Sequence, residues 1–383
     1  MGVTLALNGF AASTWISRIP ATRDRLIAEP RTLGFMLLMT GIGALAFMPL
    51  AGRLAARFGS RPVLIGSTLV AAPLLIAAAL TPNPVTTGMA MFALGAGLGT
   101  ADVVINVQGS YVDRTLDRDY MPRYHAGWSL GAITGAALGA LAARLGWQLW
   151  QHFALASMIF VLATLYFALT WYVDDRESAE DAAATVETRQ SLLRNRRIMT
   201  IGILVLAAVF LEGSAGDWLG LFLHDVRGTT QSFGALGYAT FALAMALIRI
   251  AGTPIIARYG RARTIRIAGC VALIGVLTVL LVPITAVALV GVLMWGIGTG
   301  LVYPAGMSAS GETPGRSAEA ISLVSVIGYA GFLVGPPIVG IIAQYIGLSH
   351  ALWVVVPGAI AIAVLAPVVA HTSRSDMQTA DQS

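Results

Sequence analysis

Gly95-Ala96-Gly97-Leu98-Gly99 and Gly296-Ile297-Gly298-Thr299-Gly300 are glycine-rich stretches that lie 201 residues apart in the chain. The same offset joins Ala56-Arg57-Phe58-Gly59 to Ala257-Arg258-Tyr259-Gly260. Further pairs at this offset are Gly127-Trp128 and Gly328-Tyr329, Gly139 and Gly340, and Gly146 and Gly347. Single coincidences mean little with 42 glycines, but one offset that serves both halves throughout indicates an internal repeat.

The composition places these two halves in a membrane. Of the 383 residues, 57% are hydrophobic and 11% are charged, whereas about 25% are charged in a soluble domain. A membrane-spanning helix needs about 20 mostly apolar residues, so the chain has room for twelve and little else. The expected spans are 2–19, 33–55, 62–81, 88–112, 124–144, 152–173, 198–223, 233–257, 263–283, 286–308, 318–345 and 350–371.

One long polar segment divides these spans into two sets of six. It runs from Asp174 to Arg197 and is rich in Asp, Glu, Arg, Ala and Thr. The sequence therefore predicts an all-α membrane protein with two pseudo-symmetric six-helix bundles, residues 1–173 and 198–371. We expect a cytoplasmic linker, residues 174–197, and a cytoplasmic tail, residues 372–383. The first span is short, but it lacks the basic start and cleavage site of a signal peptide, so we expect it to be retained.

The arginines predict the orientation. All 24 basic residues are Arg, and they cluster between apolar spans, as orientation signals do and as a nucleic-acid-binding surface does not. With both termini in the cytoplasm, 17 of the 24 face the cytoplasm. This excess predicts a multi-pass protein of the bacterial inner membrane. The arginines from Arg18 to Arg31 lie on the opposite side, which makes them candidates for function at the outer mouth.

A loop motif follows the second span of each half. Gly52, Arg57, Gly59 and Arg61 resemble the loop signature of the major facilitator superfamily, and the second copy keeps Arg258 and Gly260. The acidic position of that signature is Ala56 here, so the gating pair that the acid usually supplies is not expected.

Other stretches resemble the rhizopine-transporter-like (MosC-like) branch of this superfamily, which is related to the fucose permeases. They are Trp15–Pro20, Ala101-Asp102, Asn106–Gln108, His125–Gly131, Glu212-Gly213 with Asp217-Trp218, and Gly328–Pro337. The resemblance covers the whole chain. It implies a twelve-helix transporter whose first, fourth, seventh and tenth helices line a central cavity, with alternating access by rocking of the halves.

Asp102 is the first candidate proton or substrate group, because it lies near the middle of its span. Placing an Asp there costs about 2.5 to 3.5 kcal/mol, so its charge is expected to have a function. The alternative is a hydrogen bond between helices that only packs the bundle. Asn106 lies on the same helical face and Gln108 lies nearby, whereas Tyr303 occupies the matching face of the tenth span. Such a cavity suits a polar solute with one apolar face, such as a sugar.

Glu212 is the second candidate, at the centre of the seventh span, with Asp217 beyond it toward the outer side. Arg249 is the sole arginine within a predicted span. A structural ion pair between Glu212 and Arg249 is the alternative to proton coupling, and both can hold together.

Four further residues are candidates for lining the cavity. Asn8 and Trp15 share a face of the first span, and Trp218 lies on the seventh. Interfacial tryptophan belts are the other explanation for Trp15 and Trp218. Arg18 either extends to the lipid head groups or gates an anionic or polar solute.

Several function classes are disfavoured. Gly127-Trp128-Ser129-Leu130-Gly131 fits a hydrolase nucleophile motif, but it lies in an apolar helical run rather than at a strand-to-helix turn. There is no nucleotide-binding P-loop, so we expect an ion gradient to supply the energy. No metal site, cofactor or enzymatic constellation is predicted, and Cys270 is the only cysteine.

We therefore predict a monomeric, proton-coupled secondary transporter of a small polar organic solute such as a sugar or polyol. The alternative is a proton-driven efflux antiporter for drugs or metabolites.

Overall fold

The computed structural model describes residues 1–116, 121–172, 189–313 and 317–370, and every regular element in these ranges is helical. The predicted linker residues 174–188 and the tail 372–383 lie outside the described residues. The first half, residues 1–172, contains α1 (Gly2–Ile16), α2 (Ile19–Leu26), α3 (Pro30–Phe58), α4 (Ser60–Leu80), α5 (Pro84–Leu116), α6 (Met121–Arg144) and α7 (Leu149–Trp171).

The second half, residues 189–370, has the same order of long helices with more interruptions. It contains η1 (Arg189–Arg194), α9 (Arg196–Ser214), the π-helical segments η2 (Ala215–Leu219) and η3 (Phe222–Val226), α10 (Gln231–Tyr259), α11 (Arg261–Leu281), α12 (Thr285–Gly300), α13 (Val302–Gly311), α14 (Ser317–Ile346), α15 (Leu348–Ala351), η4 (Leu352–Val354), α16 (Val355–Leu365) and η5 (Ala366–Val369).

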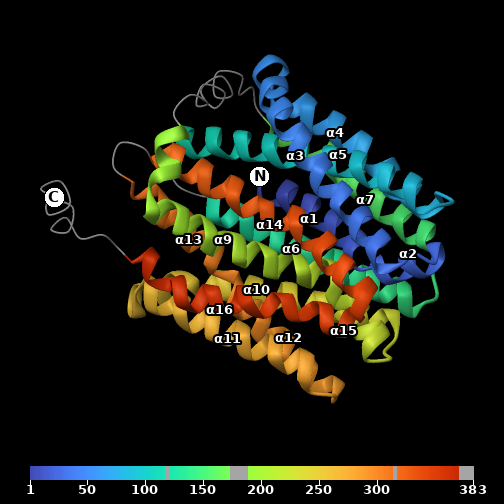
Figure 1. Cartoon of the computed structure of the whole chain (residues 1–383). Coiled ribbons are helices and arrows are strands. Elements are labelled where there is room, and N and C mark those ends of the chain that lie inside the picture. Colours follow the sequence, from blue (N-terminus) through green and yellow to red (C-terminus); the bar gives the residue numbers. More distant parts are fainter. Residues whose placement is uncertain (117–120, 173–188, 314–316, 371–383) are drawn as a thin grey trace, which may run out of the picture.

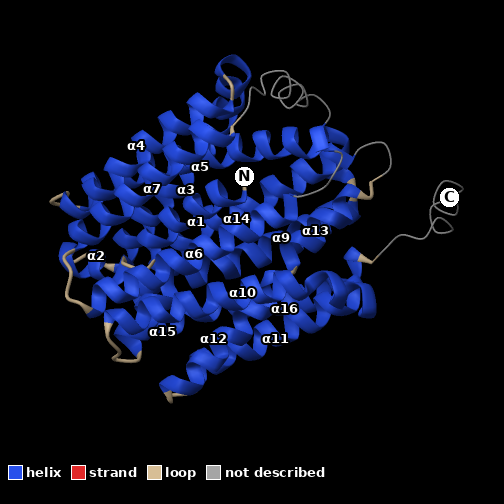
Figure 2. Ribbon diagram, turned by 180° about the vertical axis from the view of Figure 1, so that it is seen from behind, coloured by secondary structure: helices blue, strands red, loops and turns tan. Residues whose placement is uncertain are grey.

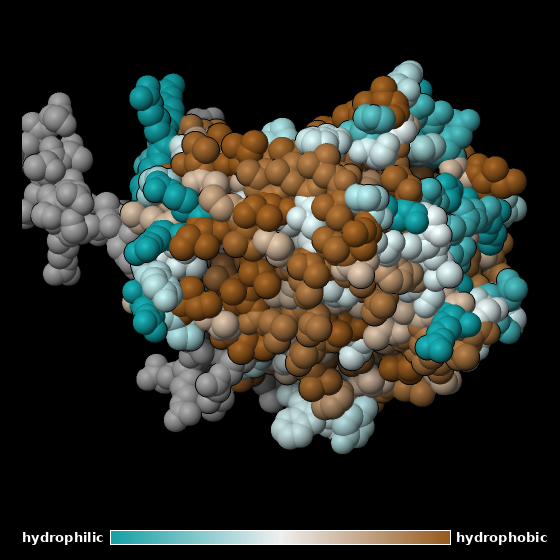
Figure 3. Space-filling model, turned by 90° about the horizontal axis from the view of Figure 1, so that it is seen from below, coloured by the Kyte–Doolittle hydropathy of each residue, from teal (hydrophilic) through white to brown (hydrophobic). Residues whose placement is uncertain are grey.

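Apolar side chains cover the middle of the outer surface on the face shown in Figure 3. Figure 3 shows hydrophobic residues across the middle of one face and hydrophilic residues toward both ends. In the described residues, 11 helical stretches are long and apolar enough to cross a membrane. The expected first span is represented by α1, whose 15 residues extend for only about 22 Å, less than the bilayer core of about 30 Å. Although short, α1 occupies the place of a first span, as its packing shows.

The packing of the helices repeats between the halves (Figures 1 and 2). In the first half α1 packs against α6, α3 against α5, and α4 against α7. In the second half the corresponding pairs are α9 with α14, α10 with α12, and α11 with α16. The two bundles predicted from the 201-residue offset are therefore present, and the all-α fold class is confirmed.

The repeat extends to backbone geometry at the turns. Gly59, between α3 and α4, has φ 83° and ψ 157°, and Gly260, between α10 and α11, has φ 77° and ψ 151°. Gly146 and Gly347, another pair at the same offset, also have positive φ, 70° and 81°. Only glycine adopts the conformation of Gly59 and Gly260 readily, so these turns explain why the glycines recur at one spacing.

The molecule has two ends, which we name by the elements they carry. The linker side carries the end of α7, the turns at Gly59 and Gly260, and the end of η5; the α2 side carries α2 and α15 (Figure 1). The sequence did not predict α2 as a helix, nor the interruption of the tenth span at Leu301 between α12 and α13.

The two halves meet along α3 with α14 and α6 with α10. A Cβ added at Gly34 would lie 2.6 Å from the Pro336 carbonyl oxygen, and one at Gly340 would lie 2.6 Å from the Pro30 carbonyl oxygen. Both approaches are on the α2 side. Backbone contact this close requires glycine and holds the halves together at that end.

Candidate solute and proton site

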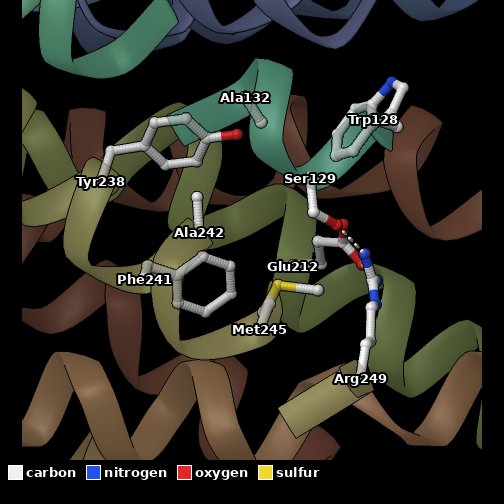
Figure 4. A pocket seen from close by; sticks show the side chains of 9 residues that line it. All are labelled: Trp128, Ser129, Ala132, Glu212, Tyr238, Phe241, Ala242, Met245 and Arg249. Carbon is white, nitrogen blue, oxygen red and sulfur yellow. Dashed lines mark hydrogen bonds and ion pairs between the residues drawn. The ribbon is translucent and has the colours of Figure 1, made fainter. Parts of the chain in front are cut away.

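A pocket lies in the middle of the bundle where the two halves face each other. Helix α6 of the first half supplies one wall, and α9 and α10 of the second half supply the others (Figure 4). The lining residues are Trp128, Ser129, Ala132, Glu212, Tyr238, Phe241, Ala242, Met245 and Arg249. One wall of this pocket is therefore charged, Ser129 adds a hydroxyl group opposite, and the remaining lining residues are aromatic or apolar.

Arg249 connects both halves from the centre of this pocket. Its Nη2 lies 3.5 Å from Glu212 Oε2, and its Nε donates to the Gly300 carbonyl oxygen at 3.1 Å. Its Nη1 donates to Ser129 Oγ in the other half at 3.2 Å (Figure 4). About a quarter of the Arg249 side chain and a fifth of the Glu212 side chain are exposed, so the pair is accessible from the cavity. The ion pair considered as one reading of Glu212 is thus present.

The π-helical segment η2 sets the position of Asp217 relative to Glu212. A π turn closes i to i+5 hydrogen bonds, so residues five apart lie closer to one helical face than they do in an α-helix. The negative charges of Glu212 and Asp217 both act on the Tyr238 hydroxyl. That hydroxyl lies 3.5 Å from Ser13 Oγ of α1, which gives a second polar contact between the halves.

Asp102 lies on α5 and is partly exposed, but it is not among the residues that line the central pocket. Asn106 Nδ2 donates to the Asp102 carbonyl oxygen at 2.8 Å and lies 3.4 Å from its Oδ2. Tyr303 of α13 and Tyr329 of α14 both lie near enough to Asp102 and Glu212 for the charges of these acids to act on their hydroxyls. Among the described residues, no cationic side chain forms an ion pair with Asp102. The two candidate acids therefore share two tyrosine neighbours, and of the two only Glu212 forms an ion pair with an arginine among the described residues.

Two amides of the first half are more deeply placed. Asn8 is 5% exposed and its Nδ2 donates to the Leu98 carbonyl oxygen at 3.3 Å, which ties α1 to α5. Gln108 is fully buried, and neither of its amide atoms has a hydrogen-bond partner in the described structure. Both residues remain predicted site residues, but neither lines the central pocket here.

The tryptophans and Arg18 are buried, contrary to their lipid-facing interpretation. Trp15 packs on Phe153 with ring centroids 6.3 Å apart, and Trp218 is 1% exposed. Neither belongs to an interfacial belt, because a belt residue faces lipid. Arg18 is 4% exposed and donates through Nη2 to the Trp147 carbonyl oxygen at 2.9 Å, so it does not extend to head groups.

The loop motif lies on the linker side, away from the pocket. A Cβ at Gly52 would meet nothing within 4 Å, whereas Gly59 and Gly260 form the two turns. Arg57 lies over the Phe58 ring at 5.2 Å, and Arg258 lies over the Tyr259 ring at 5.5 Å, so the repeat preserves this contact. Arg61 is exposed at the start of α4.

A cluster of ion pairs joins the halves on the α2 side; we call it the clasp. Arg23 donates to both carboxylate oxygens of Asp225, at 2.7 and 2.6 Å. Gln231 Nε2 donates to Asp24 Oδ2 at 3.0 Å, and His224 Nε2 lies 3.6 Å from the same oxygen. The hydrogen bonds and ion pairs that join described residues of the two halves lie in the clasp, elsewhere on the α2 side, or in the middle of the bundle.

Sequence reasoning missed seven of the nine residues that line the pocket: Trp128, Ser129, Ala132, Tyr238, Phe241, Ala242 and Met245. Ser129 appeared only as part of a hydrolase-like motif, and Tyr238 had no signal of its own. Trp128 was recognised as the repeat partner of Tyr329 but not as a pocket residue. The shared offset was the one available signal, because equivalent positions in two such halves face the same central axis.

A model of the Major Facilitator Superfamily matches residues 1–318 of the chain. The chain therefore belongs to the major facilitator superfamily, a family of membrane transporters rather than enzymes.

Two relatives cover nearly the whole chain. The uncharacterized transporter y4wD of Sinorhizobium fredii is 32% identical over 94% of this chain and 95% of that protein. The membrane protein MosC of Rhizobium meliloti is 31% identical over 93% of this chain and 86% of that protein. The predicted resemblance to the MosC-like branch is thereby confirmed.

Solved structures share the fold at low sequence identity. The nucleoside transporter NupG superposes with a TM-score of 0.73 and 15% identity, covering 96% of this chain and 97% of that one. A D-xylose-proton symporter superposes with a TM-score of 0.73 and 14% identity, covering 96% and 95%.

Proposed function

We propose that this transporter is a secondary active one that couples a small polar organic solute to protons, with the solute bound between Ser129 of α6 and the Glu212–Arg249 pair. The observation that carries the proposal is the placement of this partly exposed ion pair in the middle of the membrane, with a bond to the opposite half. Charged groups at this depth are costly and commonly serve transport.

The chemistry of the pocket supports a hydroxyl-rich solute such as a sugar or polyol. A hydroxyl group inserted between Ser129 and Arg249 accepts from the guanidinium and donates to Glu212, while Trp128 and Phe241 offer apolar faces. The structural relative that transports D-xylose with protons is consistent with this substrate class.

Proton binding provides the coupling in this proposal. Protonation neutralises the Glu212 carboxylate and so weakens its attraction to Arg249. The guanidinium is then free to bind the solute. Asp102, which lacks a cationic partner among the described residues, is the second proton carrier. The ionised form of Asp102 is the more costly one in low-dielectric surroundings. Asp102 therefore binds or releases a proton according to which side of the membrane gives water access to it.

Alternating access follows from where the halves touch. The clasp and the glycine contacts close the α2 side. The contact between Ser129 and Arg249 closes the middle of the bundle only in part. We propose that this conformation opens toward the linker side, which we assign to the cytoplasm of a bacterial inner membrane. Rocking about the pocket breaks the clasp and opens the α2 side.

The test is transport in vesicles. A thermal-shift screen of purified protein against sugars, polyols, amines and carboxylates identifies a solute, which is then offered to proteoliposomes under an imposed pH gradient. We expect uphill accumulation in wild type and in Glu29→Gln, which changes an exposed acid far from the pocket. Loss of accumulation in Glu212→Gln supports the site, and unchanged accumulation contradicts it.

The rival function is proton-driven efflux of apolar drugs or metabolites. The aromatic wall formed by Trp128, Tyr238 and Phe241 favours it, whereas the charged wall does not. The same vesicles distinguish the two, because an antiporter exchanges solute for protons and therefore accumulates solute under a gradient of the opposite sign.

A further inference from the structure

Arg18 is a buried arginine with too few partners. It is 4% exposed and lies between α1 and α2, away from the central pocket. One nitrogen, Nη2, donates to the Trp147 carbonyl oxygen at 2.9 Å. Nε and Nη1 are buried without a hydrogen-bond partner, and no acidic side chain in the described part of the chain forms an ion pair with Arg18. A guanidinium in this setting keeps its charge without a counter-charge.

His152 of α7 is the second unsatisfied group at this place. It is fully buried, both ring nitrogens lack partners in the described structure, and the charge of Arg18 acts on its ring. Ser17 adjoins the same space. A Cβ at Gly139 would overlap Ser17 Oγ and would lie 3.4 Å from His152 Cε1, so Ser17 and His152 both lie close to this glycine and to each other.

The second half fills the equivalent space with an apolar group. At the 201-residue offset, Ser17 and Arg18 correspond to Trp218 and Leu219, and Gly139 corresponds to Gly340. A Cβ at Gly340 would lie 3.3 Å from Trp218 Cη2. One copy of the repeat therefore packs the Trp218 indole beside its glycine where the other has Ser17, and Arg18 and His152 correspond to the apolar residues Leu219 and Trp353. Close packing alone does not require the polar version.

We propose that Arg18 and His152 bind a small monovalent anion, with chloride as the type, inside the first half. An anion accepts hydrogen bonds from the unpaired N–H groups and also neutralises the buried charge of Arg18. A bound water molecule does only the former. The group is enclosed within α1, α6 and α7, which restricts the ligand to a small one. The proposal does not depend on which solute the transporter carries.

Direct binding tests this proposal. Purified protein is exchanged into sodium gluconate, and binding of radioactive chloride is measured by a scintillation proximity assay, with thermal unfolding followed in parallel. We expect saturable chloride binding with a rise in the unfolding temperature. Arg18→Gln should weaken binding by about tenfold or more, because hydrogen bonds to charged groups contribute about 1.5 to 3 kcal/mol. The control is Arg25→Gln, which alters an arginine of α2 that donates to the carbonyl oxygens of Thr81 and Ala78.

Competition by other anions against radioactive chloride identifies the class of anion that the site binds. Competition by bromide alone assigns an inorganic anion, and competition by acetate as well extends the site to a small carboxylate; both support the proposal. Gluconate that competes as well as chloride would show an ionic-strength effect and overturn it. So would a wild-type protein that binds no chloride, or an Arg18→Gln protein that binds it as tightly. If Arg18→Gln does not fold, His152→Gln must weaken binding, or the proposal fails.

Discussion

At the scale of single residues, the two candidate acids, Glu212 and Asp102, differ in their partners. Glu212 faces Arg249, whereas Asp102 has only the Asn106 amide beside it. An unpaired carboxylate within the membrane gains the most from taking up a proton. Asp102→Asn should therefore abolish uphill accumulation while downhill exchange partly survives, since rocking of the halves needs the cavity rather than the charge.

Vesicles with and without a pH gradient separate these two outcomes. Glu212→Gln should impair both modes, because it leaves the Arg249 charge without its partner. An Asp102→Asn protein that still concentrates solute in response to the gradient would assign the coupling proton to Glu212 instead.

Arg249 makes a second prediction at this scale. Its guanidinium contacts three groups on three helices. A lysine keeps the charge but cannot make these three contacts at once, because its ammonium group is not a planar fork of donors. Arg249→Lys should weaken solute binding by about tenfold or more, measured by isothermal calorimetry or thermal shift. Arg53→Lys, at an exposed position of α3, should bind as wild type does. Equal affinity in both variants would remove Arg249 from the site.

At the scale of helices, glycines set the distance between α1 and α6. A Cβ at Gly131 would overlap the Ala6 carbonyl oxygen, a backbone atom that cannot move aside alone. Gly131→Ala should therefore lower stability by about 1 to 3 kcal/mol, the usual cost of overpacking. Thermal unfolding checks this, with Gly66→Ala as control, since a Cβ at Gly66 would meet nothing within 4 Å. Similar unfolding temperatures in both variants would contradict it.

Glycines at equivalent sites of the repeat do not all act alike. A Cβ at Gly127 would overlap the Gly2 carbonyl oxygen, whereas one at Gly328 would lie 2.7 Å from a methyl group of Val205, which can rotate away. We expect Gly127→Leu to be more damaging than Gly328→Leu. The repeat makes the two positions equivalent in sequence, but the atoms of the neighbouring helix decide how much space each glycine has.

At the scale of the whole molecule, the clasp biases the position of the halves. The Arg23–Asp225 pair is bidentate and about a quarter exposed, so we expect it to contribute about 1 kcal/mol to the closed α2 side. Asp225→Asn should raise the population open at that side about fivefold. Spin labels on α2 and α15, in a Cys270→Ala background, report the distance between the halves. The swapped pair, Arg23→Asp with Asp225→Arg, should restore the closed state.

The orientation of the molecule gives a further prediction at this scale. The arginine distribution predicts that both termini and the linker lie in the cytoplasm. Reporter fusions at Ser191 and Ser383 should both give cytoplasmic signals. A periplasmic signal at either would reverse the direction in which this conformation opens.

The sequence determined the class of protein, the repeat and most spans, because each depends on local apolar length or on a spacing that is visible in one chain. It also indicated Asp102, Glu212 and Arg249, since a charge in an apolar run is conspicuous. Only the tertiary structure decided that Ser129 reaches Arg249, that Arg23 meets Asp225, and that Trp15, Trp218 and Arg18 are buried. These facts depend on how each helix is rotated and on which half it faces. The sequence does not distinguish a polar residue at a helix end that contacts lipid or water from one that contacts another helix.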